Sequence, residues 1–143
     1  MAVAASLWSL IFAAVHLLWA CGWYVGLDPV AAAAAFDRPL FLAYDVVVAL
    51  GCLIAASAFG VLAANHRGRF RAAARVVCVV AAVVVAVRAV TGLGALAWRG
   101  FGLAGVFASG WDVWFVLGAV LLGAALRTRP RSSRVARVAV NKS

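Results

Sequence analysis

Four long stretches of the chain are almost entirely apolar, and short polar segments separate them. They cover residues 6–27, 41–64, 76–98 and 107–126. Each is close to the ~20 residues that a helix needs to cross a bilayer, and each is apolar on every side, as a lipid-embedded helix is. The strand-length alternation of a membrane barrel is missing. The pattern predicts an all-α fold: a four-transmembrane-helix bundle in one domain over residues 1–126.

Composition strengthens this membrane assignment. Apolar residue types make up 68% of the 143 residues, charged types make up 12%, and the mean hydropathy is +1.10. Soluble domains are only about 45–50% apolar, so soluble enzyme classes are excluded. The first apolar stretch is too long for a signal peptide, and no basic residue precedes it, so we expect it to be a retained helix.

The net charge of +9 is an orientation signal. Four arginines lie between the second and third stretches, and six basic residues follow the fourth, in the segment 127–143. The positive-inside rule then predicts a multi-pass protein of the cell membrane with both termini and a basic tail, 127–143, in the cytoplasm. The same charges would attract anionic lipids at the basic loop and the tail, and no nucleic-acid partner is expected. In the outer loop 28–40 we expect a short amphipathic turn or interfacial helix.

The second and fourth stretches repeat one another. Residues 44–51 and 111–118 share the pattern aromatic-Asp-Val-x-x-x-Leu-Gly, which aligns Asp45 with Asp112. The first and third stretches match more weakly, with His16 opposite Arg88. Either the bundle is a duplicated helical hairpin with a pseudo-two-fold axis along the membrane normal, or the likeness is chance similarity among Ala, Val and Leu.

Four ionisable side chains fall inside or near the predicted membrane core. A rise of 1.5 Å per residue places His16 and Arg88 near the midplane, and Asp45 and Asp112 about 5–10 Å outward of it. Charges at such depth normally face the bundle interior and pair. We therefore expect a bidentate contact from Arg88 to Asp112 or Asp45, and we take all four residues as candidate catalytic residues.

Aromatic residues gather at the same depth. On the first helix Trp8, Phe12, His16, Trp19 and Trp23 form one stripe. These rings are candidates for the walls of a substrate cavity, although an interfacial aromatic belt is the alternative. The candidate substrate-binding residues are Trp19, Trp23, Tyr44, Trp98, Trp111, Trp114 and Phe115.

Other site chemistries find little support in the sequence. Cys21, Cys52 and Cys78 form no Cys-x-x-Cys pair and are expected to be small core residues. The chain has two histidines and no Glu, so we expect neither a metal site nor a cofactor.

The run His16-Leu17-Leu18-Trp19-Ala20-Cys21-Gly22-Trp23 resembles the opening of a family of small actinobacterial four-helix membrane proteins of unknown function, whose members carry His-x-x-Trp-Ala-x-Gly in helix one. Residues 111–118 resemble the last helix of that family. The resemblance spans most of residues 6–126 and implies a fold but no reaction. In size, helix count and Asp/aromatic content the chain is also loosely similar to the small membrane-bound terpene cyclases.

The residues leave two function classes open. The first is an integral membrane enzyme, an isomerase of the terpene-cyclase kind, that uses a buried Asp as general acid on a lipophilic, isoprenoid-like substrate. Asp45 would donate the proton with His16 as its tuning partner, while Asp112 and Arg88 form an organising pair. The alternative is a small transporter, proton relay or accessory membrane subunit, because intramembrane Asp and Arg are equally typical of ion pathways. The substrate and the oligomeric state are not determined by these patterns.

Overall fold

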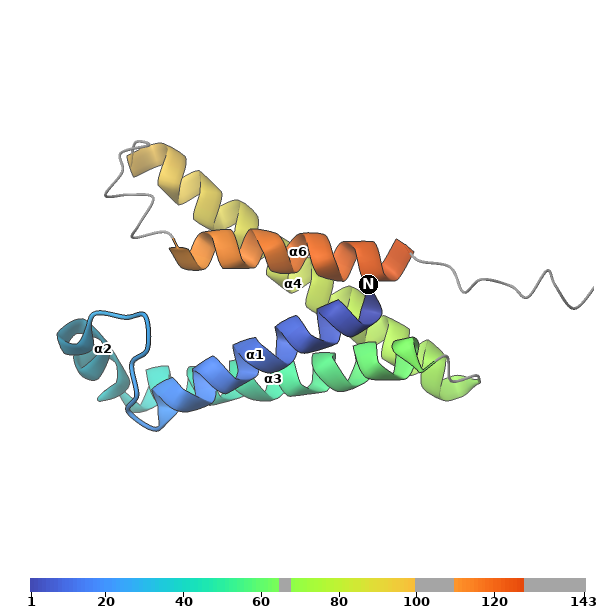
Figure 1. Cartoon of the computed structure of the whole chain (residues 1–143). Helices are drawn as coiled ribbons and strands as arrows, with labels where there is room; N and C mark the ends of the chain where they lie inside the picture. The colour runs from blue at the N-terminus through green and yellow to red at the C-terminus, as the bar shows by residue number, and fades with distance from the viewer. Residues whose placement is uncertain (65–67, 100–109, 128–143) are drawn as a thin grey trace, which may run out of the picture.

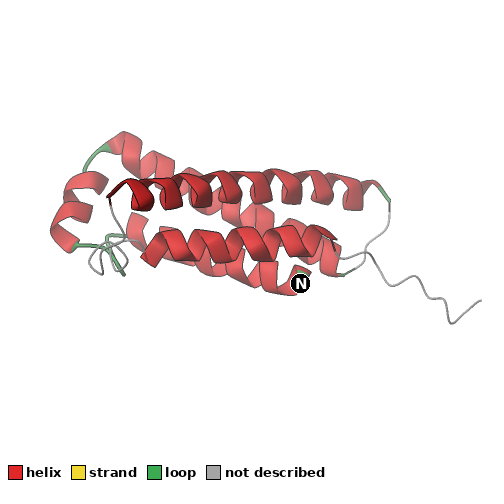
Figure 2. Ribbon diagram, turned by 90° about the horizontal axis from the view of Figure 1, so that it is seen from above, coloured by secondary structure: helices red, strands yellow, loops and turns green. Residues whose placement is uncertain are grey.

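The structure is a computed structural model that describes residues 1–64, 68–99 and 110–127. Within these residues every regular element is a helix (Figure 2). The elements are α1 (Ala2–Ala20), α2 (Pro29–Phe36), α3 (Pro39–Ala63), α4 (Arg69–Arg99) and α6 (Gly110–Arg127). The predicted all-α class is therefore confirmed.

Three of these helices are long and apolar enough to cross a membrane, over Ala2–Ala20, Pro39–Ala63 and Arg69–Ala95. This agrees with the predicted membrane protein. Many of their large apolar side chains face outward, including Leu10, Val83 and Val90. An outward apolar surface of this kind is what a lipid-facing helix bundle presents.

The helices form two antiparallel hairpins that pack against each other (Figure 1). In one hairpin α1 lies along α3, and in the other α4 lies along α6. The hairpins meet where α3 contacts α4 and where α1 contacts α6, so each long helix has two neighbours. The short helix α2 packs on α3 at one end of the bundle.

The first helix ends seven residues before the end of the predicted span 6–27, because a helix-terminating motif follows Ala20. The Gly22 amide donates to the Trp19 carbonyl, and the Trp23 amide donates to the Leu18 carbonyl. Together these bonds make a Schellman motif, which requires a left-handed residue after the C-cap. Gly22 supplies it with φ of 85°, so the chain leaves the helix after Ala20.

The outer loop contains the short helix that the sequence predicts. Asp28 caps α2, since its Oδ1 accepts a hydrogen bond of 2.8 Å from the amide of Ala31. Pro29 occupies the first helical position, where a missing N–H costs nothing. Pro39 begins α3 in the same way. These two prolines set where the outer segments become helical.

Helix α4 begins earlier than predicted, at Arg69 rather than at residue 76. Gly68, with φ of 84°, precedes the helix. Because Arg and Ala are good helix formers and no helix breaker follows Gly68, the basic segment continues into the helix. Helix α6 begins at Gly110; residues 107–109 of the predicted span and the tail 128–143 lie outside the described residues.

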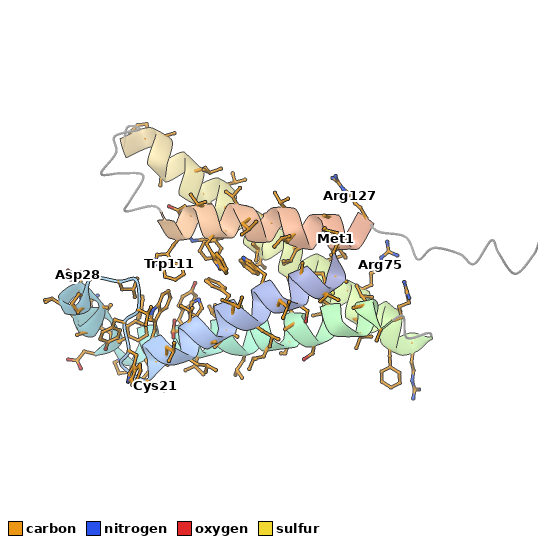
Figure 3. All side chains as sticks on the ribbon, in the orientation of Figure 1. Met1, Cys21, Asp28, Arg75, Trp111 and Arg127 are labelled. Atoms are coloured by element: carbon orange, nitrogen blue, oxygen red, sulfur yellow. The ribbon has the colours of Figure 1, made fainter. Side chains whose placement is uncertain are left out.

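The tightly packed core lies at the end of the bundle where the chain begins. It combines Trp8, Phe59, Cys78 and Leu122 with small alanines from all four long helices. Those residues lie early in α1 and α4 and late in α3 and α6. Met1, Arg75 and Arg127 mark this end in Figure 3, whereas Trp111 and Asp28 mark the opposite one. We call the first the basic end and the second the acidic end.

Gly118 sets the distance between α1 and α6. A Cβ added there would overlap three atoms of the Trp8 ring. That indole also stacks on Trp114, with ring centroids 5.7 Å apart. The Trp8 side chain therefore rests directly on the α6 backbone, which only a glycine permits.

We predict that Gly118→Ala lowers the free energy of unfolding by about 1–3 kcal/mol, the usual cost of overpacking a core. Gly123→Ala is the matched control on the same helix, because its added Cβ would meet nothing within 4 Å. Thermal unfolding of both variants in detergent, followed by circular dichroism, tests the difference. Equal melting of the two variants would contradict this packing argument.

Candidate functional site

A buried acid–base pair joins the two helices of the first hairpin. His16 Nδ1 on α1 lies 2.5 Å from Asp45 Oδ1 on α3. Both side chains are almost completely buried. One hydrogen must lie between the two atoms, donated by either the imidazole or the carboxyl group, since two lone pairs would repel each other. The remaining polar atoms, His16 Nε2 and Asp45 Oδ2, are buried and have no hydrogen-bond partner among the described residues.

Aromatic rings hold the imidazole in place. Phe12 lies one turn before His16 and meets its ring edge-to-face, with centroids 4.6 Å apart. Trp19 meets it from the other side at 4.8 Å. The ring is therefore fixed between two aromatic neighbours on its own helix, and its orientation toward Asp45 is set by packing.

The second hairpin contains the corresponding pair. Arg88 Nη1 on α4 donates to Asp112 Oδ1 on α6 over 2.8 Å. The prediction that Arg88 pairs with an acid is thus confirmed, and the acid is Asp112. The contact is a single hydrogen bond rather than the predicted bidentate one. The guanidinium also lies over the ring of Phe115, 4.6 Å from its centroid. This cation–π contact gives the guanidinium a second favourable interaction besides the hydrogen bond to Asp112.

Gly92 makes room for this ion pair. It lies one turn after Arg88 on α4, and an added Cβ would overlap the carboxylate of Asp112 and approach Arg88 Nη1 to 2.7 Å. The absence of a side chain at Gly92 therefore lets the Asp112 carboxylate reach the α4 backbone. The repeat places each acid beside the basic residue of its own hairpin, as the alignment of His16 with Arg88 implies.

Two tryptophans connect the acidic end of the bundle to the loop after α1. Trp19 Nε1 donates to the carbonyl of Val25 over 2.9 Å, and Trp111 Nε1 donates to the carbonyl of Gly26 over 3.2 Å. Their rings meet edge-to-face, with centroids 5.0 Å apart. Because Trp111 belongs to α6, these bonds fix the outer loop of one hairpin to the other hairpin.

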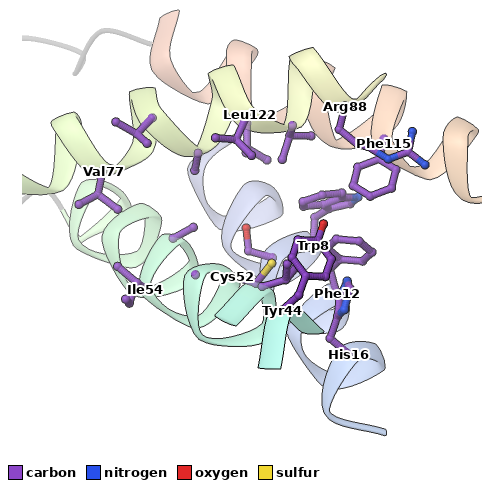
Figure 4. Close-up of a pocket in the computed structure, with 18 of the residues that line it drawn as sticks. Trp8, Phe12, His16, Tyr44, Cys52, Ile54, Val77, Arg88, Phe115 and Leu122 are labelled. Carbon is purple, nitrogen blue, oxygen red and sulfur yellow. The ribbon is translucent and has the colours of Figure 1, made fainter. Parts of the chain in front are cut away.

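A largely apolar cavity of about 470 Å³ lies between the hairpins (Figure 4). Its volume falls in the range of about 300–1,000 Å³ that is typical of small-molecule sites. All four long helices contribute to its walls. The polar and aromatic lining residues are Trp8, Ser9, Phe12, His16, Tyr44, Arg88 and Phe115.

The predicted wall residues are divided between this cavity and other places. Tyr44 and Phe115 line it. Trp114 stacks behind Trp8, and Trp111 lies at the acidic end. Trp19 lines a separate cavity beside the outer loop, whereas Trp23 and Trp98 are exposed, at 68% and 93%.

Trp8 and Phe12 line the cavity but are missing from the sequence-derived set of wall residues. The signal that could have found them is their spacing, since residues 8, 12 and 16 lie on one face of a helix. The valines of α4 that complete the wall could not be found in this way, because the whole helix is rich in Val and Ala.

Neither Asp45 nor Asp112 lines the cavity, whereas their basic partners His16 and Arg88 both do. Each acid thus stands behind a basic side chain that faces the cavity. Among the described residues no group of three His, Cys, Asp or Glu side chains is placed to hold a metal ion.

In comparisons with known proteins, no family model, curated protein or solved structure matches the chain. The resemblance to small four-helix membrane proteins therefore stays an expectation from the sequence. What the site can do must be argued from its own geometry.

We predict that Gly92→Ala displaces Asp112 from Arg88 and destabilises the protein. Gly94→Ala is the matched control, because a Cβ there meets nothing within 4 Å. Because the ion pair is partly exposed, we expect the free energy of unfolding of Gly92→Ala to be only about 0.5–1 kcal/mol below that of Gly94→Ala. Thermal unfolding in detergent measures it.

The same measurement in an Asp112→Ala background identifies the cause. There the cost of Gly92→Ala should largely disappear, because the carboxylate it displaces is gone. A cost of unchanged size in both backgrounds would show that Gly92 does not act through the ion pair.

Proposed function

We propose that the chain is a four-span protein of the cell membrane with both termini in the cytoplasm. Helix α6 would be the fourth span, beside the three helices that are long and apolar enough to cross a membrane. Arg69, Arg75 and Arg127 lie at one end of the bundle, and Asp28 and Asp37 lie at the other. Basic residues gather on the cytoplasmic side of membrane proteins, where they attract anionic lipids.

We infer further that the protein is an enzyme that transfers a proton to a lipophilic, isoprenoid-like substrate. The observation that carries this proposal is the buried His16–Asp45 pair in the wall of an apolar cavity. Burying ionisable groups in such a place is costly unless they pair, and a pair that retains two unpartnered atoms is not optimised for stability alone. Ionisable residues inside a membrane-spanning bundle are therefore candidates for a functional site.

The geometry supports a specific route for the proton. Asp45 is the source, and His16 stands between it and the cavity. The imidazole gives the proton on Nε2 to the substrate while Nδ1 takes the proton from Asp45 Oδ1. Asp45 becomes a carboxylate, and the imidazole stays neutral with its proton on Nδ1. When the substrate cation later loses a proton to Nε2, the original state returns.

The aromatic walls suit the cation that such a step creates. Protonation of an alkene or an epoxide leaves positive charge on carbon, and the faces of Trp8, Phe12 and Phe115 could stabilise it. An apolar cavity also keeps water from quenching the cation. An acid-initiated cyclisation, as in the membrane-bound terpene cyclases, is therefore the reaction that we propose.

A second candidate is a proton relay or small transporter. It is favoured by the occurrence of one acid–base pair in each hairpin, since paired ionisable groups inside a membrane are typical of ion pathways. Such a protein would move protons across the bilayer without turning over a lipophilic substrate.

We predict that Asp45→Asn reduces turnover of a prenylated substrate by about 10²–10⁴-fold, the usual contribution of a general acid. Asp37→Asn, which makes the same chemical change at an exposed position, is the matched control and should keep full activity. Product formation by the purified protein in detergent is the measurement, with thermal melting as a check of folding. A folded Asp45→Asn variant with full activity would overturn the proposed role of Asp45.

The topology gives a separate prediction for the two ends of the bundle. In a variant that keeps only Cys21, which is exposed beyond the end of α1, a membrane-impermeant maleimide should label intact cells. Ala64→Cys, in a background without the native cysteines, should be labelled only after the membrane is permeabilised. The reverse pattern would place the basic end outside and refute the proposed orientation.

A further inference from the structure

The cavity between the hairpins is polar at one end and apolar at the other. Figure 4 shows His16, Tyr44 and Arg88 toward one end, and Val77 and Ile54 toward the other. The apolar end is formed by valines of α4 and by aliphatic residues of α3. A ligand that fits this gradient has one polar head and one hydrocarbon chain.

The polar end contains two buried ring nitrogens that have no hydrogen-bond partner among the described residues. They are Trp8 Nε1 and His16 Nε2, and both side chains line the cavity. His16 Nε2 is a donor in the protonation state that the proposed reaction requires. An indole N–H can only donate, and an unsatisfied buried donor costs about 1–3 kcal/mol. The guanidinium of Arg88 carries further N–H groups besides the one that Asp112 accepts. The missing partner is therefore an acceptor, such as an oxygen atom.

The charges around the cavity already balance. Arg88 is neutralised by Asp112. The His16–Asp45 pair is neutral in the state in which one proton lies between Nδ1 and Oδ1 and a second proton is on Nε2. An anionic head group would add an uncompensated charge to an apolar cavity, which is strongly unfavourable. An uncharged oxygen accepts the same hydrogen bonds without that cost.

The cavity is open on one side of the bundle. Tyr44, Val80 and Val84 line it, and each is more than half exposed. In the proposed four-span arrangement this side faces lipid. A lipophilic molecule could then enter laterally from the bilayer, with its chain passing between α3 and α4.

We propose that the cavity binds a single-chain lipophilic molecule whose head is an uncharged oxygen group, such as an alcohol, ketone or epoxide, and excludes the corresponding phosphates. The head accepts hydrogen bonds from Trp8, His16 and Arg88, and the chain lies along the valines of α4. This inference rests on the proposed function for its choice of an isoprenoid chain and names the class of substrate for the same site.

The test is a competition between farnesol and farnesyl diphosphate, which share one chain and differ in the charge of the head. The full-length protein in detergent is incubated with equal concentrations of both, and native mass spectrometry measures which is retained. We expect at least about tenfold more farnesol, a difference of about 1.4 kcal/mol. Equal retention, a preference for the diphosphate, or retention of neither would overturn the proposal.

Two tryptophan variants on α4 locate the binding site. Val80 lines the cavity and Val83 does not, yet the two side chains are almost equally exposed, at 57% and 56%. Val80→Trp should fill the cavity and abolish farnesol retention, whereas Val83→Trp should leave it unchanged. Equal effects of the two would show that farnesol binds elsewhere or to the detergent.

The outcome is separable from that of the proposed reaction, because retention requires no turnover. If farnesol is retained as expected but Asp45→Asn keeps full activity, the acid role fails and the binding site stands. If Asp45→Asn loses activity but the diphosphate is retained in preference, the uncharged head group is wrong and the proton transfer stands.

Discussion

The cost of placing an ionisable side chain in an apolar bundle governs the arrangement of this molecule. His16, Asp45, Arg88 and Asp112 could each be held inside it only with a partner of opposite character. The pairs form within the hairpins, between α1 and α3 and between α4 and α6. Each hairpin therefore pairs its own ionisable side chains, and the surfaces left to join the hairpins are largely apolar.

That division explains where the packing is tight and where it is open. At the basic end Trp8 rests on Gly118 and the alanines of the core bring the four long helices together. Further along, the rings of Phe12 and Phe115 meet edge-to-face between the hairpins, and with His16 and Arg88 they line the cavity that lies there. At the acidic end Trp111 reconnects them through the carbonyl of Gly26. The cavity is thus bounded by close packing at the basic end and by hydrogen bonds at the acidic end.

The same arrangement gives the two pairs different capabilities. His16 and Asp45 form a buried hydrogen-bonded pair, and in the proposed reaction this pair exchanges a proton with a molecule in the cavity. The guanidinium of Arg88 can only donate hydrogen bonds, and its contacts with Asp112 and Phe115 hold it in place. In the function that we propose, the first hairpin transfers the proton and the second orients the ligand.

The sequence by itself determined the helical class, the approximate positions of the long helices and the four ionisable residues, because uninterrupted apolar stretches and isolated charges can be recognised without knowing the fold. It predicted that Arg88 pairs with an acid but left open whether that acid is Asp112 or Asp45, although the repeat aligned His16 with Arg88 and Asp45 with Asp112. The end of α1 at Ala20 and the early start of α4 were missed, although Gly22 and the helix-forming arginines carry local signals for both. Only the tertiary structure decided that Trp8 and Phe12 line the cavity while Trp23 and Trp98 do not. Which rings meet depends on how two apolar hairpins pack, and in helices built almost wholly from Ala, Val and Leu the sequence does not distinguish the face that packs from the face that meets lipid.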